Sequence, residues 1–311
     1  LEGEPLPDGI VDAAVRDYFP RTLAELAGPE AVAGHLLRRE IAMTMLVNRI
    51  VDNAGGTLLA EVAVASGRTT RDIVVAYLQA SEAAQIDAIR EDVYACEDER
   101  RQEAVYQAMT SIENALEDAT YYLIDQMELP PLDAASIVQT RELMERVGQA
   151  LPMGSKGRMA TRLRRWEDSG VPRGLAERLV KLRYLTPVLD AVRSAAILGR
   201  EPKDLLRLRL QVTDRVNFLY LNQALDRMVY SSPWDGPAVS ALRRQLNFHL
   251  HKLVRMVDGD DVDGMIERYK LGEFCAHVLA QAESGPTISG LVMLDDWLRR
   301  LLPPLAALAR R

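Results

Sequence analysis

Hydrophobic side chains recur along most of the chain at spacings of three and four residues, the period of one face of an α-helix. The most regular run has spacings of 4, 3, 4, 3 and 4 residues and consists of Val105, Met109, Ile112, Leu116, Ala119 and Leu123. An earlier stretch carries a compatible apolar stripe formed by Ile73, Val74, Tyr77, Ala80, Ala84 and Ala88. Because this is the seam spacing of helices packed side by side, residues 70–128 are predicted to form a long antiparallel helical hairpin that closes near Glu97-Asp98.

Glycine, proline and serine clusters divide the rest of the chain into shorter predicted helices. One helix opens at Ile10 and is interrupted at Pro20, and a longer one runs from about 30 to 53 and ends at Gly55-Gly56. The segment Thr69-Thr70-Arg71-Asp72 has the hydroxyl and carboxylate typical of a helix start. After Pro130-Pro131, helices are expected at about 133–150, 156–168, 172–184, 187–199, 203–230, 236–257, 262–283 and 288–309.

The predicted fold class is all-α, a multi-helix array in which a bundle of shorter helices follows the long antiparallel hairpin. No stretch of four to eight residues between turn signals alternates strictly in polarity, which makes a doubly wound nucleotide-binding sheet improbable. A length of 311 residues suggests about two domains. We expect an N-terminal helical part over 1–131 and a C-terminal helical bundle over 132–311, or one continuous domain with the same helices.

Composition agrees with helix and excludes several classes of protein. Hydrophobic residues make up 48% of the chain, aromatic residues only 5%, and 33 of the 38 basic residues are arginine. No run approaches 18 apolar residues, so a membrane segment is not expected. Cys96 and Cys275 lie far apart and indicate neither a disulfide scaffold nor a zinc site, which favours a reduced, cytoplasmic location. The start at Leu1 without methionine leads us to expect a fragment of a longer protein.

The net charge of −7 combines two halves of opposite sign. Residues 1–150 hold 12 basic and 27 acidic side chains, whereas residues 151–311 hold 26 basic and 18 acidic ones. The most basic segment, 156–183, has nine cations against three acidic side chains: Lys156, Arg158, Arg162, Arg164, Arg165, Arg173, Arg178, Lys181 and Arg183. This local field is predicted to dock an acidic surface; binding to nucleic acid is the weaker alternative because no base-reading motif accompanies it.

Other candidate chemistry is weak. Gly55-Gly56 and the segment 154–158 match no phosphate-binding motif and are interpreted as a helix stop and a loop. The acidic segment 258–264 fits a calcium loop in neither register, so a solvated loop with a helix cap is favoured. His249 and His251 stand two apart and would face nearly opposite sides of a helix, so one metal ion could not take both. His249 is predicted to be a hydrogen-bonded histidine at the edge of a core.

The segment from His35 to Gly56 carries polar groups at helical offsets. His35 and Arg39 are four residues apart, as are Asn48 and Asp52. Because buried polar side chains need partners, the segment is interpreted as a joint between helices and not as a catalytic site. The residues proposed for this interdomain or structural motif are His35, Arg38, Arg39, Glu40, Asn48, Asp52 and Gly55.

The same segment, with Tyr18-Phe19-Pro20 before it, resembles the C-terminal region of the large-type bacterial NAD-dependent glutamate dehydrogenases, whose pattern is close to "YFP…HPLRREI…N…VN…G". The residues that match the part from His35 onward are His35, Arg38, Arg39, Glu40, Ile41, Asn48, Val51 and Gly55. Leu36 replaces the usual proline, and Asp52 stands where asparagine is frequent. Further similar segments follow in the expected order: Gly170-Val171-Pro172 with Leu175-Ala176, and Trp234 with Ala241-Leu242 and Leu246.

The resemblance implies a parent enzyme that oxidises L-glutamate with NAD and water to 2-oxoglutarate, ammonium and NADH in the cytoplasm. It also implies that the catalytic lysine, the catalytic aspartate and the nucleotide-binding sheet lie upstream, so no catalytic, cofactor-binding or metal residue is assigned here, and NAD belongs to the parent enzyme. We expect a structural or assembly role toward the catalytic domain of the same polypeptide, in a homo-oligomer. The alternative is an independent helical module that binds an acidic protein or nucleic acid through the 156–183 surface.

Overall fold

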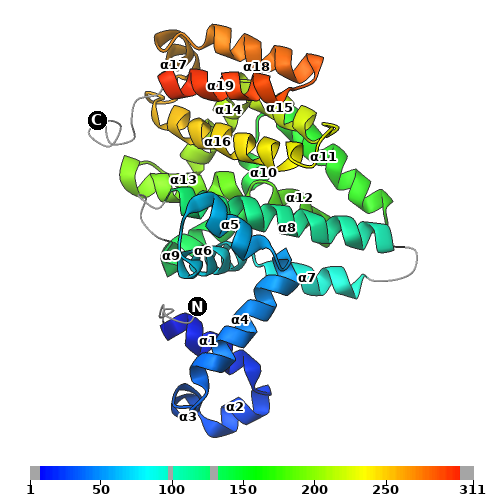
Figure 1. The fold of residues 1–311 in the computed structure, drawn as a ribbon, viewed down its shortest axis with the longest axis vertical. Coiled ribbons are helices and arrows are strands. Elements are labelled where there is room, and N and C mark those ends of the chain that lie inside the picture. The colour runs from blue at the N-terminus through cyan, green and yellow to red at the C-terminus, as the bar shows by residue number, and fades with distance from the viewer. Residues whose placement is uncertain (1–7, 97–100, 127–131, 302–311) are drawn as a thin grey trace. The chain divides into compact units, whose positions relative to one another are not determined.

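The structure is a computed structural model that describes residues 8–96, 101–126 and 132–301. Over these residues every regular element is an α-helix, and nineteen helices follow one another along the chain (Figure 1). The all-α prediction is confirmed. None of the helices in the described ranges is long and apolar enough to cross a membrane. The chain divides into two compact units, Leu1–Gln126 and Met127–Arg311.

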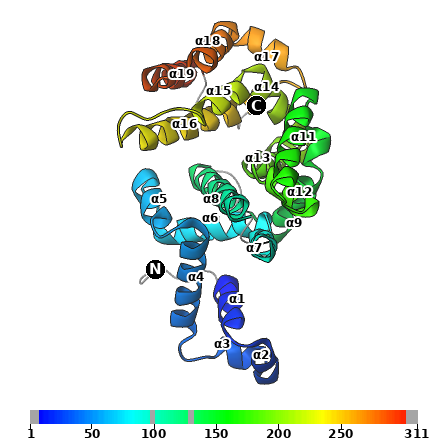
Figure 2. The same ribbon diagram turned by 90° about the vertical axis from the view of Figure 1, so that its right-hand side faces the viewer.

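Unit 1 contains eight helices within its described residues: α1 (Asp8–Tyr18), α2 (Arg21–Ala27), α3 (Pro29–Ala33), α4 (Arg38–Ala54), α5 (Leu58–Ser66), α6 (Thr70–Ala83), α7 (Ile86–Ala95) and α8 (Gln102–Asp125). Helix α1 packs along α4, and α2 and α3 pack on each other and on α1. Figure 2 shows α1, α2 and α3 gathered at one end of α4, with α5 to α8 at its other end. Unit 1 thus has a small helical group and a larger one, joined through α4.

The predicted hairpin corresponds to α6, α7 and α8. Both α6 and α7 pack on α8, and the apolar stripes meet as expected because the buried residues include Ile73, Val74, Tyr77, Ala80, Ile112, Leu116, Ala119 and Leu123. The predicted start at Thr69 is confirmed, since its hydroxyl accepts a hydrogen bond from the backbone N–H of Asp72 at 3.2 Å. The expected closure near Glu97-Asp98 and the expected end at 128 lie outside the described residues.

The first arm of the hairpin is not one continuous helix. Gln85 adopts a left-handed conformation with φ of 53°, and this residue separates α6 from α7. The break rotates the apolar face, so Ala88, which belonged to the predicted stripe, is exposed. Ile86 and Ile89 are buried instead. The stripe prediction is therefore wrong at its end, because it assumed an unbroken helical register across Gln85.

Two further boundaries in unit 1 differ from the prediction. The expected helix over 30–53 is two helices, α3 and α4, separated at 34–37 by a turn in which the backbone N–H of Arg38 donates to the carbonyl of His35 at 3.0 Å. Helix α5, which buries Leu58 and Val62, was not predicted, because its apolar residues are too evenly spread to mark one face. The predicted stop at Gly55 is confirmed: Gly55 has φ of 79° and donates to the carbonyl of Val51.

Unit 2 contains the remaining helices of the described residues: α9 (Ala134–Glu145), α10 (Val147–Ala150), α11 (Met153–Asp168), α12 (Arg173–Leu182), α13 (Leu185–Leu198), α14 (Pro202–Arg215), α15 (Phe218–Leu225), α16 (Asp235–Arg255), α17 (Val262–Arg268), α18 (Gly272–Ser284) and α19 (Ile288–Leu301). Helix α16 packs on α19 and on α14, and α14 packs in turn on α13. A continuous core joins α14 to α19 and includes Val212, Phe218, Leu246, Leu253, Leu271, Phe274 and Leu294.

Two helices predicted to be continuous in unit 2 are broken by residues with positive φ. Asn217, at φ of 61°, separates α14 from α15, and Lys270, at φ of 53°, separates α17 from α18. The amide of Asn217 donates from Nδ2 to the carbonyl of Cys275 at 3.1 Å, which ties the first break to α18. The predicted helix over 288–309 is described as far as Leu301.

Candidate functional site

The proposed interdomain motif lies on and beside helix α4. Arg38, Arg39, Glu40, Asn48 and Asp52 belong to α4 itself. His35 lies in the turn that precedes the helix, and Gly55 is the residue at which it ends. The motif therefore extends along the helix that joins the two parts of unit 1, and the structure does not gather its residues at one point.

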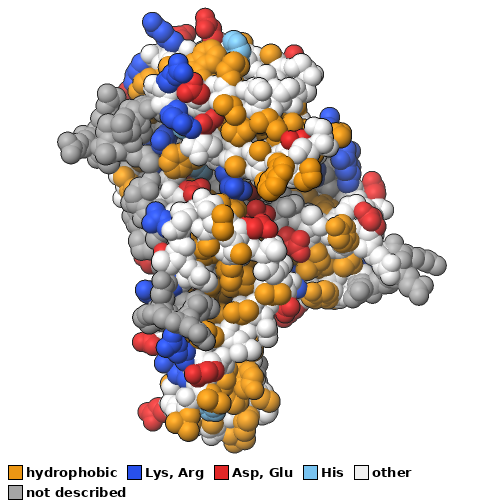
Figure 3. All heavy atoms as spheres, in the orientation of Figure 1, with side chains coloured by type: hydrophobic (Ala, Val, Ile, Leu, Met, Phe, Trp, Pro, Cys, Tyr) orange, Lys and Arg blue, Asp and Glu red, His pale blue; other side chains and the backbone are white. Residues whose placement is uncertain are grey.

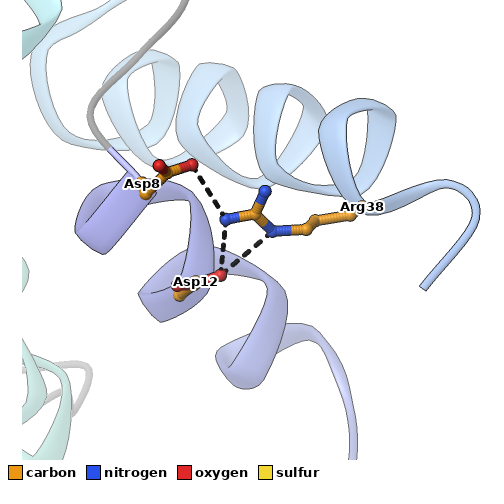
Figure 4. A network of polar contacts seen from close by, with 3 residues as sticks. All are labelled: Asp8, Asp12 and Arg38. Atoms are coloured by element: carbon orange, nitrogen blue, oxygen red, sulfur yellow. Dashed lines mark hydrogen bonds and ion pairs between the residues drawn. The ribbon is translucent and has the colours of Figure 1, made fainter. Parts of the chain in front are cut away.

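Arg38 holds the start of α4 against α1 (Figure 4). Its Nε and Nη2 atoms donate to Oδ1 of Asp12 at 3.0 and 2.7 Å, and Nη2 also donates to Oδ1 of Asp8 at 3.2 Å. These hydrogen bonds to the carboxylates of Asp12 and Asp8 raise the pKa of Arg38 above its ordinary value. Asp8 and Asp12 are four residues apart and share one face of α1, so a single guanidinium reaches both.

His35 shapes the turn before α4. Its Nδ1 accepts a hydrogen bond from the backbone N–H of Leu37 at 3.1 Å, so the ring caps the turn. The same ring lies 5.5 Å from the ring of Phe19, measured between centroids. His35 therefore contacts both the segment that follows α1 and the turn before α4.

The other polar residues of the motif face outward. Arg39, Glu40, Asn48 and Asp52 are exposed, and the backbone carbonyl of Glu40 accepts a hydrogen bond from the hydroxyl of Thr44 at 2.9 Å. Of the proposed set, Arg38 thus contacts α1, and His35 contacts Phe19 in the segment that follows α1. A function for the exposed members stays a prediction.

The basic segment 156–183 occupies α11, α12 and the residue after α12. Lys156, Arg164, Arg165, Arg173 and Arg183 are exposed, whereas Arg158, Arg162, Arg178 and Lys181 are half-buried. Helix α11 buries only Ser155 fully, so most of its surface faces solvent.

Several cations of this segment have partners within unit 2. Arg158 donates to Ser155 Oγ at 2.8 Å and lies 3.5 Å from Asp214. Arg173 pairs with Glu177 and Glu167, at 3.0 and 3.5 Å. The positive field available to a partner is therefore weaker than the sequence count indicates.

Two more cations of the segment are tied to their surroundings. Lys181 donates to the carbonyl of Glu145 at 3.0 Å. Burial lowers the pKa of Arg162, against the opposing influence of Tyr184 and Asp226. On α11 itself, the exposed cations of the segment are Lys156, Arg164 and Arg165.

His249 and His251 point to opposite sides of α16, as predicted. The Nε2 atom of His249 lies 2.9 Å from Oδ1 of Asp295 on α19, and both side chains are buried. The Nδ1 atom of His251 lies 2.7 Å from Oδ2 of Asp190 on α13, also in the interior. The prediction that His249 is a hydrogen-bonded histidine beside a core is confirmed.

Burial and neighbouring charges shift the pKa values of three of these four buried side chains. Burial by itself would raise the pKa of Asp190, but the contact with His251 and the nearby charges of Arg209 and Arg255 lower it below its ordinary value. Burial lowers the pKa of His251 to about 4, although Asp190 acts in the opposite direction. Burial also lowers the pKa of His249, with Asp295 opposing it. At neutral pH the carboxylate of Asp190 is therefore charged, and the imidazoles of His249 and His251 are neutral.

Sequence reasoning missed the carboxylate partners of these residues. Asp190 and Asp295 each follow a mostly apolar run: Leu185-Thr186-Pro187-Val188-Leu189 before the first and Leu291-Val292-Met293-Leu294 before the second. A carboxylate on a buried helix face is itself a signal of a buried cationic or histidine partner. Also missed was Arg49 of α4, which forms an ion pair with Asp87 of α7. No sequence spacing links two residues so far apart.

The remaining candidate motifs have structural roles. Asp261 caps α17 by accepting a hydrogen bond from the backbone N–H of Gly264 at 2.8 Å, which confirms the predicted helix cap. Arg200 donates to the carbonyl of Gly259 and to the carboxylate of Asp260. The segment 154–158 lies inside α11, so its interpretation as a loop is wrong: its two glycines are accommodated in the first turns of a helix. Among the described side chains, no group of three or more His, Cys, Asp or Glu residues could hold a metal ion.

A sequence profile of the family described as "Glutamate dehydrogenase, C-terminal" matches residues 4–273. The chain belongs to this family. The match includes the α4 motif, the basic segment and the buried pair of His251 with Asp190, and it agrees with the resemblance inferred from the residues alone.

Three curated proteins that are similar to this chain are each called NAD-specific glutamate dehydrogenase. The Mycobacterium tuberculosis protein is 27% identical over 286 residues, which is 90% of this chain and 16% of that protein. The Halomonas elongata protein is 23% identical over 250 residues, 79% of this chain and 15% of that protein. The Pseudomonas aeruginosa protein is 23% identical over 260 residues, 78% of this chain and 15% of that protein. The chain thus spans about one sixth of the length of the relatives it matches.

Proposed function

We propose that this chain is a non-catalytic helical C-terminal region of an NAD-dependent glutamate dehydrogenase, with a structural and assembly role toward the catalytic part of the same polypeptide. The observation that carries the proposal is the family match over 4–273, in a region that makes up about one sixth of each relative. The parent enzyme would oxidise L-glutamate with NAD in the cytoplasm and would act as a homo-oligomer.

Two features of the described residues support an assembly role over catalysis. The two buried histidines of α16 are each in contact with a buried aspartate, His251 with Asp190 and His249 with Asp295. The polar motif of unit 1 joins α1 to α4 through Arg38 and His35. In this proposal the chemistry of the parent enzyme, including NAD binding, belongs to the preceding part of the polypeptide.

The proposal predicts that the isolated chain neither turns over glutamate nor binds NAD. Isothermal calorimetry with NAD tests the second point, and saturable binding in the micromolar range would contradict it. Capture of the separately expressed catalytic part by this chain tests the assembly role directly. Lack of capture, with both proteins folded by circular dichroism, would argue against that role.

The alternative function is an independent module that binds an acidic protein or nucleic acid through the 156–183 surface. The observation in its favour is that Lys156, Arg164 and Arg165 of α11 are exposed, on a helix that buries little of its own surface. Binding through phosphates weakens steeply with salt. Fluorescence anisotropy with a DNA or RNA probe at low and high salt separates this function from the first, because the first predicts no salt-sensitive binding.

A further inference from the structure

Five large apolar side chains are exposed at the end of unit 1 formed by α1, α2 and the turn before α4. We refer to Tyr18, Leu23, Leu26, Leu36 and Leu37 as the apolar tip. Leu36 is 98% exposed and Leu26 85%, and the other three expose more than half of their surface. Figure 3 shows hydrophobic side chains gathered over this end of unit 1, at the bottom of the view. Contiguous exposed apolar surface of this kind marks an interaction site in a soluble protein.

The apolar tip is displayed by a fixed structure. Beneath it, Val15 of α1, Val32 of α3 and Ala42 of α4 are buried. The ion pairs of Arg38 with Asp8 and Asp12 hold α1 against α4.

The turn that carries two of the leucines is also constrained. The Nδ1 atom of His35 accepts from the N–H of Leu37, and its ring contacts Phe19, which in turn lies edge-on to Tyr18 at 5.1 Å. Leu36 and Leu37 therefore point outward while their backbone is held by hydrogen bonds. Pre-organisation of this kind lowers the entropy that binding must overcome.

The candidate partner for this surface is the part of the polypeptide that precedes this region in proteins of the family. The match covers only 15 to 16% of the relatives, and its family description places it at the C-terminal end, so most of such a polypeptide precedes it. Helix α1 begins at Asp8, so any part joined before residue 1 is separated from α1 by seven residues, which span at most about 25 Å. A partner tethered at the start of α1 is one 11-residue helix away from Tyr18, and therefore meets the apolar tip at a high effective concentration.

We propose that the apolar tip is the surface on which the preceding part of the glutamate dehydrogenase polypeptide docks, with an apolar groove receiving Leu26 and Leu36. This inference rests on the proposed function and specifies its contact. Exposed charged residues lie close to the apolar tip in sequence: Asp17 on α1, Glu30 on α3 and Arg39 at the start of α4. They suit the polar rim that surrounds the apolar centre of a protein interface.

Cysteine accessibility in two proteins tests this contact: the 311-residue chain and the complete glutamate dehydrogenase polypeptide that carries it. Leu36→Cys and, separately, Leu26→Cys are labelled with a maleimide, and the labelled peptides are identified by mass so that Cys96 and Cys275 do not interfere. Val64 is a matched control, because it is an apolar residue of the same unit, on α5, and is 88% exposed. We expect labelling at 26 and 36 to be slower by about tenfold or more in the complete polypeptide. Labelling of Val64→Cys should proceed at similar rates in both proteins.

Equal labelling rates of Leu36→Cys and Leu26→Cys in the two proteins would overturn the proposal. If the catalytic part is nevertheless captured by the chain, the assembly role stands and only its location is wrong. If protection of these positions appears in the 311-residue chain alone and increases with its concentration, the occupant is a second copy, which also overturns the proposal. Protection confined to the complete polypeptide, at any concentration, supports it.

Discussion

His251 of α16 and Asp190 of α13 form a buried contact, with 2.7 Å between Nδ1 of the histidine and Oδ2 of the aspartate. Arg255 lies 3.6 Å from the other carboxylate oxygen, and the hydroxyl of Ser194 donates to it at 3.3 Å. The charge of Arg209 also acts on Asp190. The carboxylate of Asp190 therefore interacts with polar or positively charged side chains from three helices, α13, α14 and α16.

Replacing Asp190 should destabilise unit 2 strongly. Asp190→Asn removes the negative charge and leaves Arg209 and Arg255 without its compensation, which for a buried pair costs about 3–5 kcal/mol. Urea unfolding followed by circular dichroism measures the change. Asp296→Asn is the control, because the Asp296–Arg300 pair on α19 is largely exposed and is worth at most about 0.5 kcal/mol. Similar losses in the two variants would contradict the special role of Asp190.

The buried histidines predict a loss of stability in mild acid. The pKa of His251 falls to about 4 on folding, so the unfolded chain, whose histidine titrates near 6.5, binds the proton first. Stability is complete above about pH 6.5 and decreases as the pH falls toward 4. The loss from this residue is about 3 kcal/mol, and His249, whose pKa is also lowered, contributes in the same direction.

Substitution identifies the source of that pH dependence. His251→Gln should be less stable than the parent at pH 7.5 but should lose less stability between pH 7.5 and 5, since the titrating group is gone. His277→Gln serves as the comparison, because His277 is exposed on α18. Urea midpoints at both pH values give the result. A slope in His251→Gln equal to that of the parent would refute the assignment.

Glycine should stabilise the chain at two of its helix breaks. Gln85 and Lys270 are exposed residues with positive φ, a conformation that costs an L-residue energy but not glycine. Gln85→Gly and Lys270→Gly are each expected to raise the free energy of unfolding by about 0.5–1 kcal/mol. Asn217→Gly should not show this gain, because it loses the hydrogen bond from Nδ2 to the carbonyl of Cys275. Thermal and urea unfolding distinguish the three variants.

Breaking the contact between α1 and α4 should loosen α1 locally. Arg38→Ala removes the hydrogen bonds to Asp8 and Asp12, both in contact with solvent, so the global unfolding transition should change little. Hydrogen exchange of the α1 amides should nevertheless become faster, because α1 is held by few buried side chains. Glu40→Ala, at an exposed position of the same turn of α4, is the control. Unchanged exchange in Arg38→Ala would show that packing alone holds α1.

The sequence predicted helix content and the packed seam because both follow from local spacing. Ile112, Leu116, Ala119 and Leu123 recur with helical period and are buried against α6, and Gly55 ends α4 where glycine permits positive φ. The breaks at Gln85 and Lys270 could not be predicted in the same way. Neither residue favours a left-handed conformation, so tertiary packing imposes it.

In the candidate site, too, local spacing predicted some features, and tertiary packing decides the others. The two-residue spacing of His249 and His251 predicted opposite orientations correctly, since helix geometry alone decides that. Their partners Asp295 and Asp190 lie 46 and 61 positions away along the chain, and only the packing of α16 against α19 and near α13 brings them together. Likewise Arg38 was placed in a helix joint, but its partner Asp12 depends on how α1 lies along α4.

The two histidines of α16 also bear on how unit 2 unfolds. One contacts Asp295 of α19 and the other Asp190 of α13, so a single helix carries a buried polar anchor on each side. Burial lowers the pKa of both, so acid destabilises the packing around both anchors in the same direction. Helices on the two sides of α16 should therefore separate in one cooperative step on acidification, without an intermediate in which one layer has detached and the other remains.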